Sequence, residues 1–292
     1  MKFMKKLALT AGISMVVILG AAAPLALATD TRNESRLDIA PGGTVTLVNN
    51  AGVVNVHAGP GHQVILISVT RSPKIEVDQS TTPDRQRVKI STHVLSEQPP
   101  TDDEARVDYD VTVPAGVAVT VTTATAPITV DGLRGDVVLA SETGQIVVRN
   151  ISKAHVHIRG VAAPISLSGI TNGHVEITSS GGAVELRNVA GPLVSVGTTS
   201  GNIVYQGDCS GGCTYTLSTH SGAIDVNLPE TASVDLSARS VSGSVQNDFP
   251  LQQKTHTSFV PKPGSSFAGT SLSGSSSVEL QSFSGRIRVK KQ

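Results

Sequence analysis

Apolar residues recur at a nearly constant spacing along the middle of the chain. From about residue 121 onward, an isoleucine or valine returns every 18 to 21 residues, and three further apolar columns keep the same phase. One column contains Ile128, Ile146, Ile165, Val184, Ile203, Ile224 and Val245. Another contains Leu139, Ile158, Ile177, Val196, Leu217 and Leu236. Columns that stay in phase over several repeats are typical of a solenoid, in which each short unit buries its apolar face on its neighbours.

Each repeat predicts two short strands separated by turns, because apolar and polar residues alternate with a period of two. Small polar corners precede the first strand, as in residues 199–201 and 220–222, where glycine permits a tight bend and Ser or Thr bonds nearby backbone. We therefore expect an all-β, single-chain β-helix with rungs of ~19 residues, about 4.8 Å apart. Right-handed coiling is the default for parallel crossovers. An antiparallel sandwich is the alternative, and the constant spacing favours the solenoid.

The segments that flank the array differ from it. Residues 37–120 alternate β-branched and charged residues, and residues 44–56 resemble one rung, so we expect an N-terminal β cap continuous with solenoid rungs at 121–249. Residues 250–292 contain Pro261 and Pro263 and predict a loop followed by capping strands at 277–282 and 286–291. The basic residues of the last strand are expected to protect a sheet edge. They are Arg286, Arg288, Lys290 and Lys291.

Residues 1–28 predict a signal peptide. Lys2, Lys5 and Lys6 precede an uncharged stretch that ends in Ala26-Leu27-Ala28, the small-x-small pattern of a cleavage site. The stretch is also long enough to span a bilayer, so a retained anchor is the alternative. Residues 29–36 are expected to form a disordered linker. The expected location is the periplasm, the cell surface or the extracellular space, without stable membrane insertion after cleavage.

The composition of the chain limits the classes of partner that the protein is expected to bind. Without the three lysines of the signal, the chain carries 20 basic and 23 acidic residues, a formal charge of −3. This charge offers no electrostatic surface for nucleic acid. The chain has no Trp, and four of its five Phe lie near the C-terminus, where we expect them to plug the solenoid end; an exposed partner-binding patch is the alternative. These are Phe249, Phe259, Phe267 and Phe283.

The two cysteines, Cys209 and Cys213, predict a disulfide, because an exported protein meets oxidising conditions. The repeat lengthens by two residues at this point, which indicates a clipped, protruding turn. Two thiolates without a nearby histidine make a poor zinc site.

One polar cluster is predicted on an outward face. If the rungs stack in register, His155 lies beside His174 and His157 beside Glu176. Imidazoles and a carboxylate on one face bind transition metals or respond to pH, and an ordinary solvated face is the alternative. No cofactor is predicted.

The sequence predicts no catalytic residue. Acidic residues are scattered through the rungs, and Asp225 and Asp235 are the one pair singled out as able to approach each other. A Gly-x-Ser-x-Gly elbow, a phosphate loop and a His-Glu-x-x-His motif do not occur. A non-enzymatic function is therefore expected.

Three motifs carry a resemblance to a known family. Rungs of the Thr-x-Ser-Gly-Asp-Ile type appear as residues 198–203 and 219–226, and a Val-x-Val-Pro-x-Gly link appears as residues 111–116. The chain resembles the bacterial putative-adhesin family over residues 37–289. That resemblance implies an exported β-solenoid of unknown function with surface, adhesion or envelope-stress roles. The acidic rung position is filled by residues such as Gln145 and Asn202, so an acidic ladder for cations is absent.

The function expected from these observations is an adhesin-like or envelope interaction module that binds an envelope protein or glycan. Two alternatives stay open. A carbohydrate-active β-helix enzyme requires convergent carboxylates or basic groups in a groove. A ligand-sensing partner of an envelope-stress regulator is the other.

Overall fold

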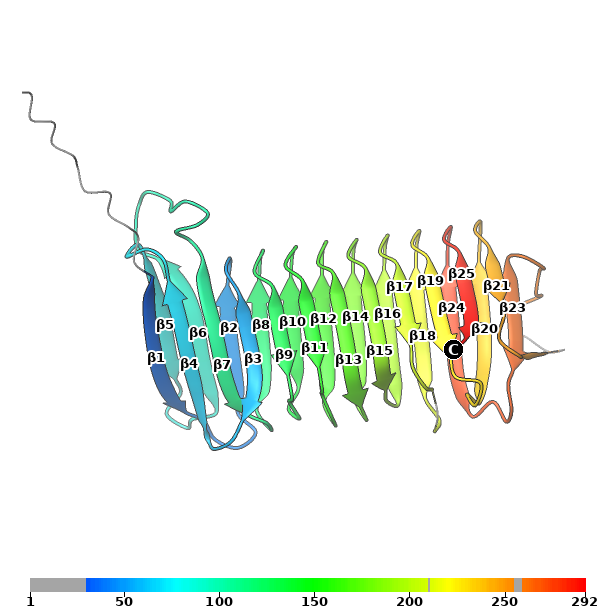
Figure 1. Ribbon diagram of the computed structural model, residues 1–292, viewed down its shortest axis with the longest axis horizontal. Coiled ribbons are helices and arrows are strands. Elements are labelled where there is room, and N and C mark those ends of the chain that lie inside the picture. The colour runs from blue at the N-terminus through cyan, green and yellow to red at the C-terminus, as the bar shows by residue number, and fades with distance from the viewer. Residues whose placement is uncertain (1–29, 210, 255–258) are drawn as a thin grey trace, which may run out of the picture.

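The computed structural model describes residues 30–209, 211–254 and 259–292; the predicted signal peptide lies outside these residues. In the described part, 25 strands form two long sheets, and Figure 1 shows them as one elongated stack. The all-β prediction is confirmed, and the long parallel sheets are those of a β-solenoid. None of the described segments is a helix long and apolar enough to cross a membrane.

The middle of the stack follows the chain in order, with every pair parallel. One sheet contains β9 (Ile128–Asp131), β11 (Ile146–Arg149), β13 (Ile165–Thr171), β15 (Val184–Ala190), β17 (Ile203–Gln206) and β19 (Ile224–Leu228). The other contains β8 (Ala118–Thr123), β10 (Val137–Ser141), β12 (His155–Gly160), β14 (His174–Ser179), β16 (Leu193–Thr198) and β18 (Thr214–Thr219). The register places Ile146 beside Ile165 and Ile165 beside Val184, and all three are buried. The apolar columns therefore share one dry interior.

The corners between the sheets are close-packed. A Cβ atom on Gly182 would lie 1.8 Å from the carbonyl oxygen of Ala163 in the preceding corner, so only glycine lets the two corners stack. The Thr198 hydroxyl accepts the N–H of Gly201 at 2.9 Å, and Thr219 accepts that of Gly222 at 3.0 Å. The recurrent Thr-x-x-Gly spacing thus satisfies the corner backbone.

At the N-terminal end the chain leaves its sequential order. β2 (Thr44–Asn49) and β3 (Val54–Gly59) extend the parallel ladders beyond β8 and β9. β6 (Arg87–Val94) and β7 (Val107–Pro114) lie beyond them, again parallel. Outside these lie β4 (Gln63–Thr70) and β5 (Ile75–Thr81), which are antiparallel to their neighbours. The pair β6–β7 therefore fills a place between two pairs that precede it in the chain.

The disordered linker predicted for residues 29–36 is wrong from Thr31 onward. β1 (Thr31–Asp38) pairs with β4 along its whole length, from Thr31 beside Thr70 to Asp38 beside Gln63. Most of its side chains are exposed, so it lacks the apolar pattern that marks a strand, and its order comes from the backbone ladder.

The C-terminal strands also depart from the prediction. The elements are β20 (Val234–Ser240), β21 (Val245–Asn247), β22 (Gln252–Gln253), β23 (Ser266–Thr270), β24 (Ser276–Ser282) and β25 (Ile287–Lys291). β24 lies between β18 and β20, and β25 lies between β19 and β21, as the red strands of Figure 1 show. Leu217 is therefore beside Leu280, and Ile224 is beside Ile287 rather than Val245.

The prediction that 277–282 and 286–291 are capping strands that protect an edge is thus wrong. The two strands carry the same apolar alternation and the same Ser-Gly corner as a central rung, so they fit an internal place. The C-terminal phenylalanines were predicted to fill the end of the solenoid. Phe249 is buried, as this prediction requires, but Phe283 is 49% exposed.

Candidate functional site

The histidine face lies on the outside of β12 and β14. The rings of His155 and His174 stack with centroids 4.7 Å apart. Nδ1 of His157 lies 3.2 Å from Oε2 of Glu176. The Arg159 guanidinium donates to Nε2 of His157 at 3.0 Å, so the proton of a neutral His157 ring lies on Nδ1 and points at Glu176.

This arrangement gives two pairs rather than one metal site. Both ring nitrogens of His157 already have partners, and one of those partners is a cation that a metal ion would have to displace. Across the described residues, no group of three or more His, Cys, Asp or Glu side chains is arranged to hold a metal ion.

The lengthened repeat contains a disulfide and a tyrosine pair. Cys209 and Cys213 are joined, and both are buried. The rings of Tyr205 and Tyr215 meet edge to face at 5.3 Å, and burial raises the pKa of both phenols. Tyr205 lies beside Leu186 and Tyr215 beside Val194, so tyrosines replace smaller aliphatic residues in both columns. The extra length accommodates these rings as well as the clipped turn.

Asp225 and Asp235 are not brought together. Asp225 lies on β19 and pairs with Arg286 at 3.4 Å, whereas Asp235 lies on β20 in the other sheet and pairs with Lys254. Each carboxylate is thus neutralised separately, and the pair cannot act as an acid and a base on one substrate.

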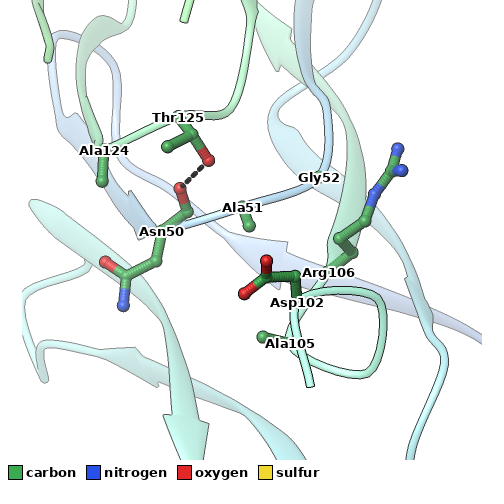
Figure 2. Close-up of a pocket in the computed structure, with 8 residues that line it drawn as sticks. All are labelled: Asn50, Ala51, Gly52, Asp102, Ala105, Arg106, Ala124 and Thr125. Carbon is green, nitrogen blue, oxygen red and sulfur yellow. Dashed lines mark hydrogen bonds between the residues drawn. The ribbon is translucent and has the colours of Figure 1, made fainter. Parts of the chain in front are cut away.

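A pocket of about 550 Å³ lies at the corner between β2 and β3, here called the corner pocket. Figure 2 shows the residues that line it, which come from three consecutive corners of the stack. They are Asn50, Ala51, Gly52, Asp102, Ala105, Arg106, Ala124 and Thr125.

The pocket exists because one corner is replaced by a long loop. Four residues, 199–202, connect β16 to β17, but twelve residues, 95–106, connect β6 to β7. The loop is fixed at its base by Arg71, which pairs with Asp108 at 2.8 Å, and by Lys74, which pairs with Glu104 at 3.0 Å. The backbone N–H of Thr101, followed by Lys74, holds the pKa of Glu104 below its usual value.

The floor of the corner pocket is rigid. The buried side-chain amide of Asn49 donates to the carbonyls of Ala51 and Val107, each at 2.9 Å. Gly52 has a φ of 110°, and a Cβ atom there would lie 2.1 Å from the Val107 carbonyl oxygen. Above this segment, Thr125 donates its N–H to the Asn50 carbonyl at 2.9 Å. The sequence analysis assigned this whole region to the N-terminal β cap and did not predict the pocket.

Three solved structures are similar to this chain. A putative adhesin from Bacteroides fragilis has a TM-score of 0.53 at 10% identity, covering 91% of this chain and 99% of its own. A putative lipid binding protein from Parabacteroides distasonis has a TM-score of 0.41 at 10% identity, covering 89% and 96%. A putative cell adhesion protein from Clostridium sporogenes has a TM-score of 0.31 at 10% identity, covering 90% and 100%. At such identity, the likeness to the first of these concerns the fold alone.

No curated protein matches the chain. The family model described as Toastrack DUF4097 matches residues 107–290, which include β7, all the central rungs and the inserted C-terminal strands. This match covers more than half of the sequence and agrees with the putative-adhesin resemblance of the rung motifs. The chain belongs to the Toastrack DUF4097 family.

Proposed function

We propose that the protein is an exported, non-enzymatic, adhesin-like module that binds a glycan or a protein of the bacterial cell envelope. The observation that carries this proposal is a continuous, mostly polar ladder on the outside of a rigid stack. Its members face outward from consecutive strands of one sheet. They are Thr46, Thr120, Val138, His157, Glu176, Ser195, Thr216, Glu279 and Ser237.

Such a ladder repeats hydroxyl and charged groups at the strand spacing of about 4.8 Å. An extended repeat surface suits a partner that is itself extended, such as a polysaccharide. Membership of the family supports this reading, as does the fold shared with a protein named a putative adhesin. The charge balance disfavours nucleic acid as a partner.

An enzymatic function has less support. The one carboxylate pair singled out in the sequence lies on two different sheets, and each member has its own cationic partner. The described residues offer no specific observation in favour of the carbohydrate-active enzyme or of the sensor for an envelope-stress regulator.

The proposal includes export by a signal peptide at 1–28, right-handed coiling, rungs of ~19 residues and β caps at both ends. Antiparallel strands at each end support the caps, because β4 and β5 lie at one end and β23 at the other. A bare parallel edge would recruit other chains.

The test measures binding and turnover together. The purified protein is applied to a panel of envelope polysaccharides and to an envelope protein fraction, and the same polysaccharides are assayed for cleavage products. We expect retention on at least one partner without product. Thr216→Lys on the ladder should weaken that retention, whereas Gln206→Lys on the other sheet should not. Turnover, or no retention on any partner, would overturn the proposal.

A further inference from the structure

The corners of the stack form their own hydrogen-bond ladder. The second residue of each corner donates its backbone N–H to the first corner residue of the neighbouring rung; Ser200, for example, donates to the Ser180 carbonyl at 2.9 Å. The same bond occurs in all the corners from β8 to the C-terminal end. The donors are Thr125, Thr143, Ala162, Gly181, Ser200, Ser221, Ser284 and Ser242.

The corner between β2 and β3 breaks this rule. Ala51 is its second residue, and neither the N–H of Ala51 nor that of Gly52 has a hydrogen-bond acceptor among the described residues. The cause is the neighbouring rung β6–β7, whose corner is replaced by the loop 95–106. Two adjacent backbone donors therefore border the corner pocket, and neighbouring N–H groups of this kind attract anions.

The charged side chains that line the corner pocket are also without partners among the described residues. Arg106 and Asp102 make no ion pair or side-chain hydrogen bond within the part of the chain that the structure describes. Their neighbours Asp103 and Glu104 pair with Arg71 and Lys74. Figure 2 shows Arg106 extending beside Gly52 and the Asp102 carboxylate below Ala51.

We propose that the corner pocket binds a carboxylate-bearing sugar residue, such as a uronate. The sugar carboxylate accepts hydrogen bonds from Arg106 and from the N–H groups of Ala51 and Gly52, a charge-assisted arrangement. A sugar hydroxyl donates to the Asp102 carboxylate. Because Asp102 is itself an anion, the pocket favours a monoanion with hydroxyl donors over a phosphate dianion.

The size and walls of the pocket fit this ligand class. A volume of about 550 Å³ lies within the range of small-molecule sites, and Ala51, Ala105 and Ala124 supply apolar wall for the C–H face of a sugar ring. This inference rests on the proposed function in one respect, since it names the acidic sugar as the glycan feature that the module recognises.

The test is calorimetric titration of the purified protein with glucuronate, with glucose and with inorganic phosphate. We expect glucuronate to bind at least about tenfold more tightly than either competitor, and Arg106→Gln to weaken it by about tenfold or more. Asp102→Asn should weaken glucuronate less, because a hydrogen-bond acceptor remains. Arg134→Gln is the matched control, since Arg134 is an exposed arginine on another turn and its loss should leave the affinity unchanged.

Circular dichroism and the melting temperature verify that each variant is folded. No glucuronate binding by the wild type, equal binding by Arg106→Gln, or tighter binding of glucose or phosphate would each overturn the inference. Polysaccharide binding that survives Arg106→Gln would refute the pocket and leave the proposed function intact. Glucuronate binding that requires Arg106, without retention on any envelope partner, would support the pocket and refute the proposed function.

Discussion

The central rungs and the two ends of the stack share the same buried apolar columns but differ in their order of assembly. From β8 to β19, neighbours in the chain are neighbours in space. At the ends, β6–β7 and β24–β25 each enter between pairs that the chain has already passed. The position of a rung in the stack is thus determined by its apolar columns and not by its place in the sequence. A rung that is inserted late requires the closure of a longer loop. This closure lowers the folding rate more than it lowers the stability of the folded protein.

The largest expected effect tests the close-packed corner of the central rungs. Gly182→Ala places a methyl group 1.8 Å from the Ala163 carbonyl, so consecutive rungs must separate, and we expect a loss of about 3 kcal/mol or more in the free energy of unfolding. Gly181→Ala is the control, because its Cβ would find its nearest atom at 3.5 Å and its φ is ordinary. Urea unfolding measures both; equal losses would show that the corner is not close-packed.

The second prediction compares a central rung with an inserted one. Leu139→Ala on β10 and Leu280→Ala on β24 each remove a fully buried side chain, and both should cost about 3 kcal/mol. Hydrogen exchange should separate them. Only Leu280→Ala should accelerate exchange in β20 to β25 while leaving β8 to β14 protected, because the inserted strands can open without the centre. Uniform acceleration in both variants would contradict the comparison.

The same contrast explains which features could be predicted from the sequence. The central columns follow from a constant spacing and a period of two, and Ile146, Ile165 and Val184 are adjacent as expected. After Ile224, both Val245 and Ile287 fit the column, and proximity in the chain favours the wrong one. Nothing local distinguishes them, because both follow a Ser-Gly corner.

The candidate site was hidden for a related reason. The donors of Ala51 and Gly52 are backbone groups, which have no residue signature, and their availability depends on a loop some fifty residues later in the chain. The histidine pairs were accessible to sequence reasoning because they follow directly from the register of β12 and β14. The positions of side chains can be predicted from a repeat. That the N–H groups of Ala51 and Gly52 lack acceptors becomes visible only when the order of the rungs is known.

A third prediction uses pH to probe the inserted N-terminal rung. Burial raises the pKa of Tyr109 on β7 to about 12, above the ordinary value of 10.0. Its neutral phenol therefore contributes fully to stability below pH 10, and this contribution is lost as the pH rises from 10 to 12. By pH 12 the loss should reach about 2 to 3 kcal/mol.

Tyr109→Phe is the matched variant for this prediction. It removes the hydrogen bond to Thr92 at 2.9 Å and should be about 1 kcal/mol less stable at pH 7. It should nevertheless lose less stability than the wild type between pH 10 and 12, because position 109 no longer carries an ionisable phenol, whereas the contributions of Tyr205 and Tyr215 are the same in both proteins. Parallel pH profiles of urea unfolding would show that Tyr109 is not responsible.

The smallest effect concerns the tyrosine pair of the lengthened repeat. Tyr205 and Tyr215 both donate to the carbonyl of Val189, at 3.0 and 3.3 Å, and β17 ends at Gln206 before it can supply a backbone donor there. Tyr205→Phe alone leaves the carbonyl with one partner and should cost about 0.5 kcal/mol. Tyr215→Phe also removes the acceptor of the Gly191 N–H, which lies 3.3 Å from the hydroxyl, and should cost about 1 kcal/mol. The double variant leaves a buried acceptor unsatisfied, so it should cost about 2 kcal/mol, more than the sum of the singles. A double-mutant cycle by urea unfolding measures the difference. Additive losses would mean that the two hydroxyls act independently, and that the extra length of this rung only makes room for the rings.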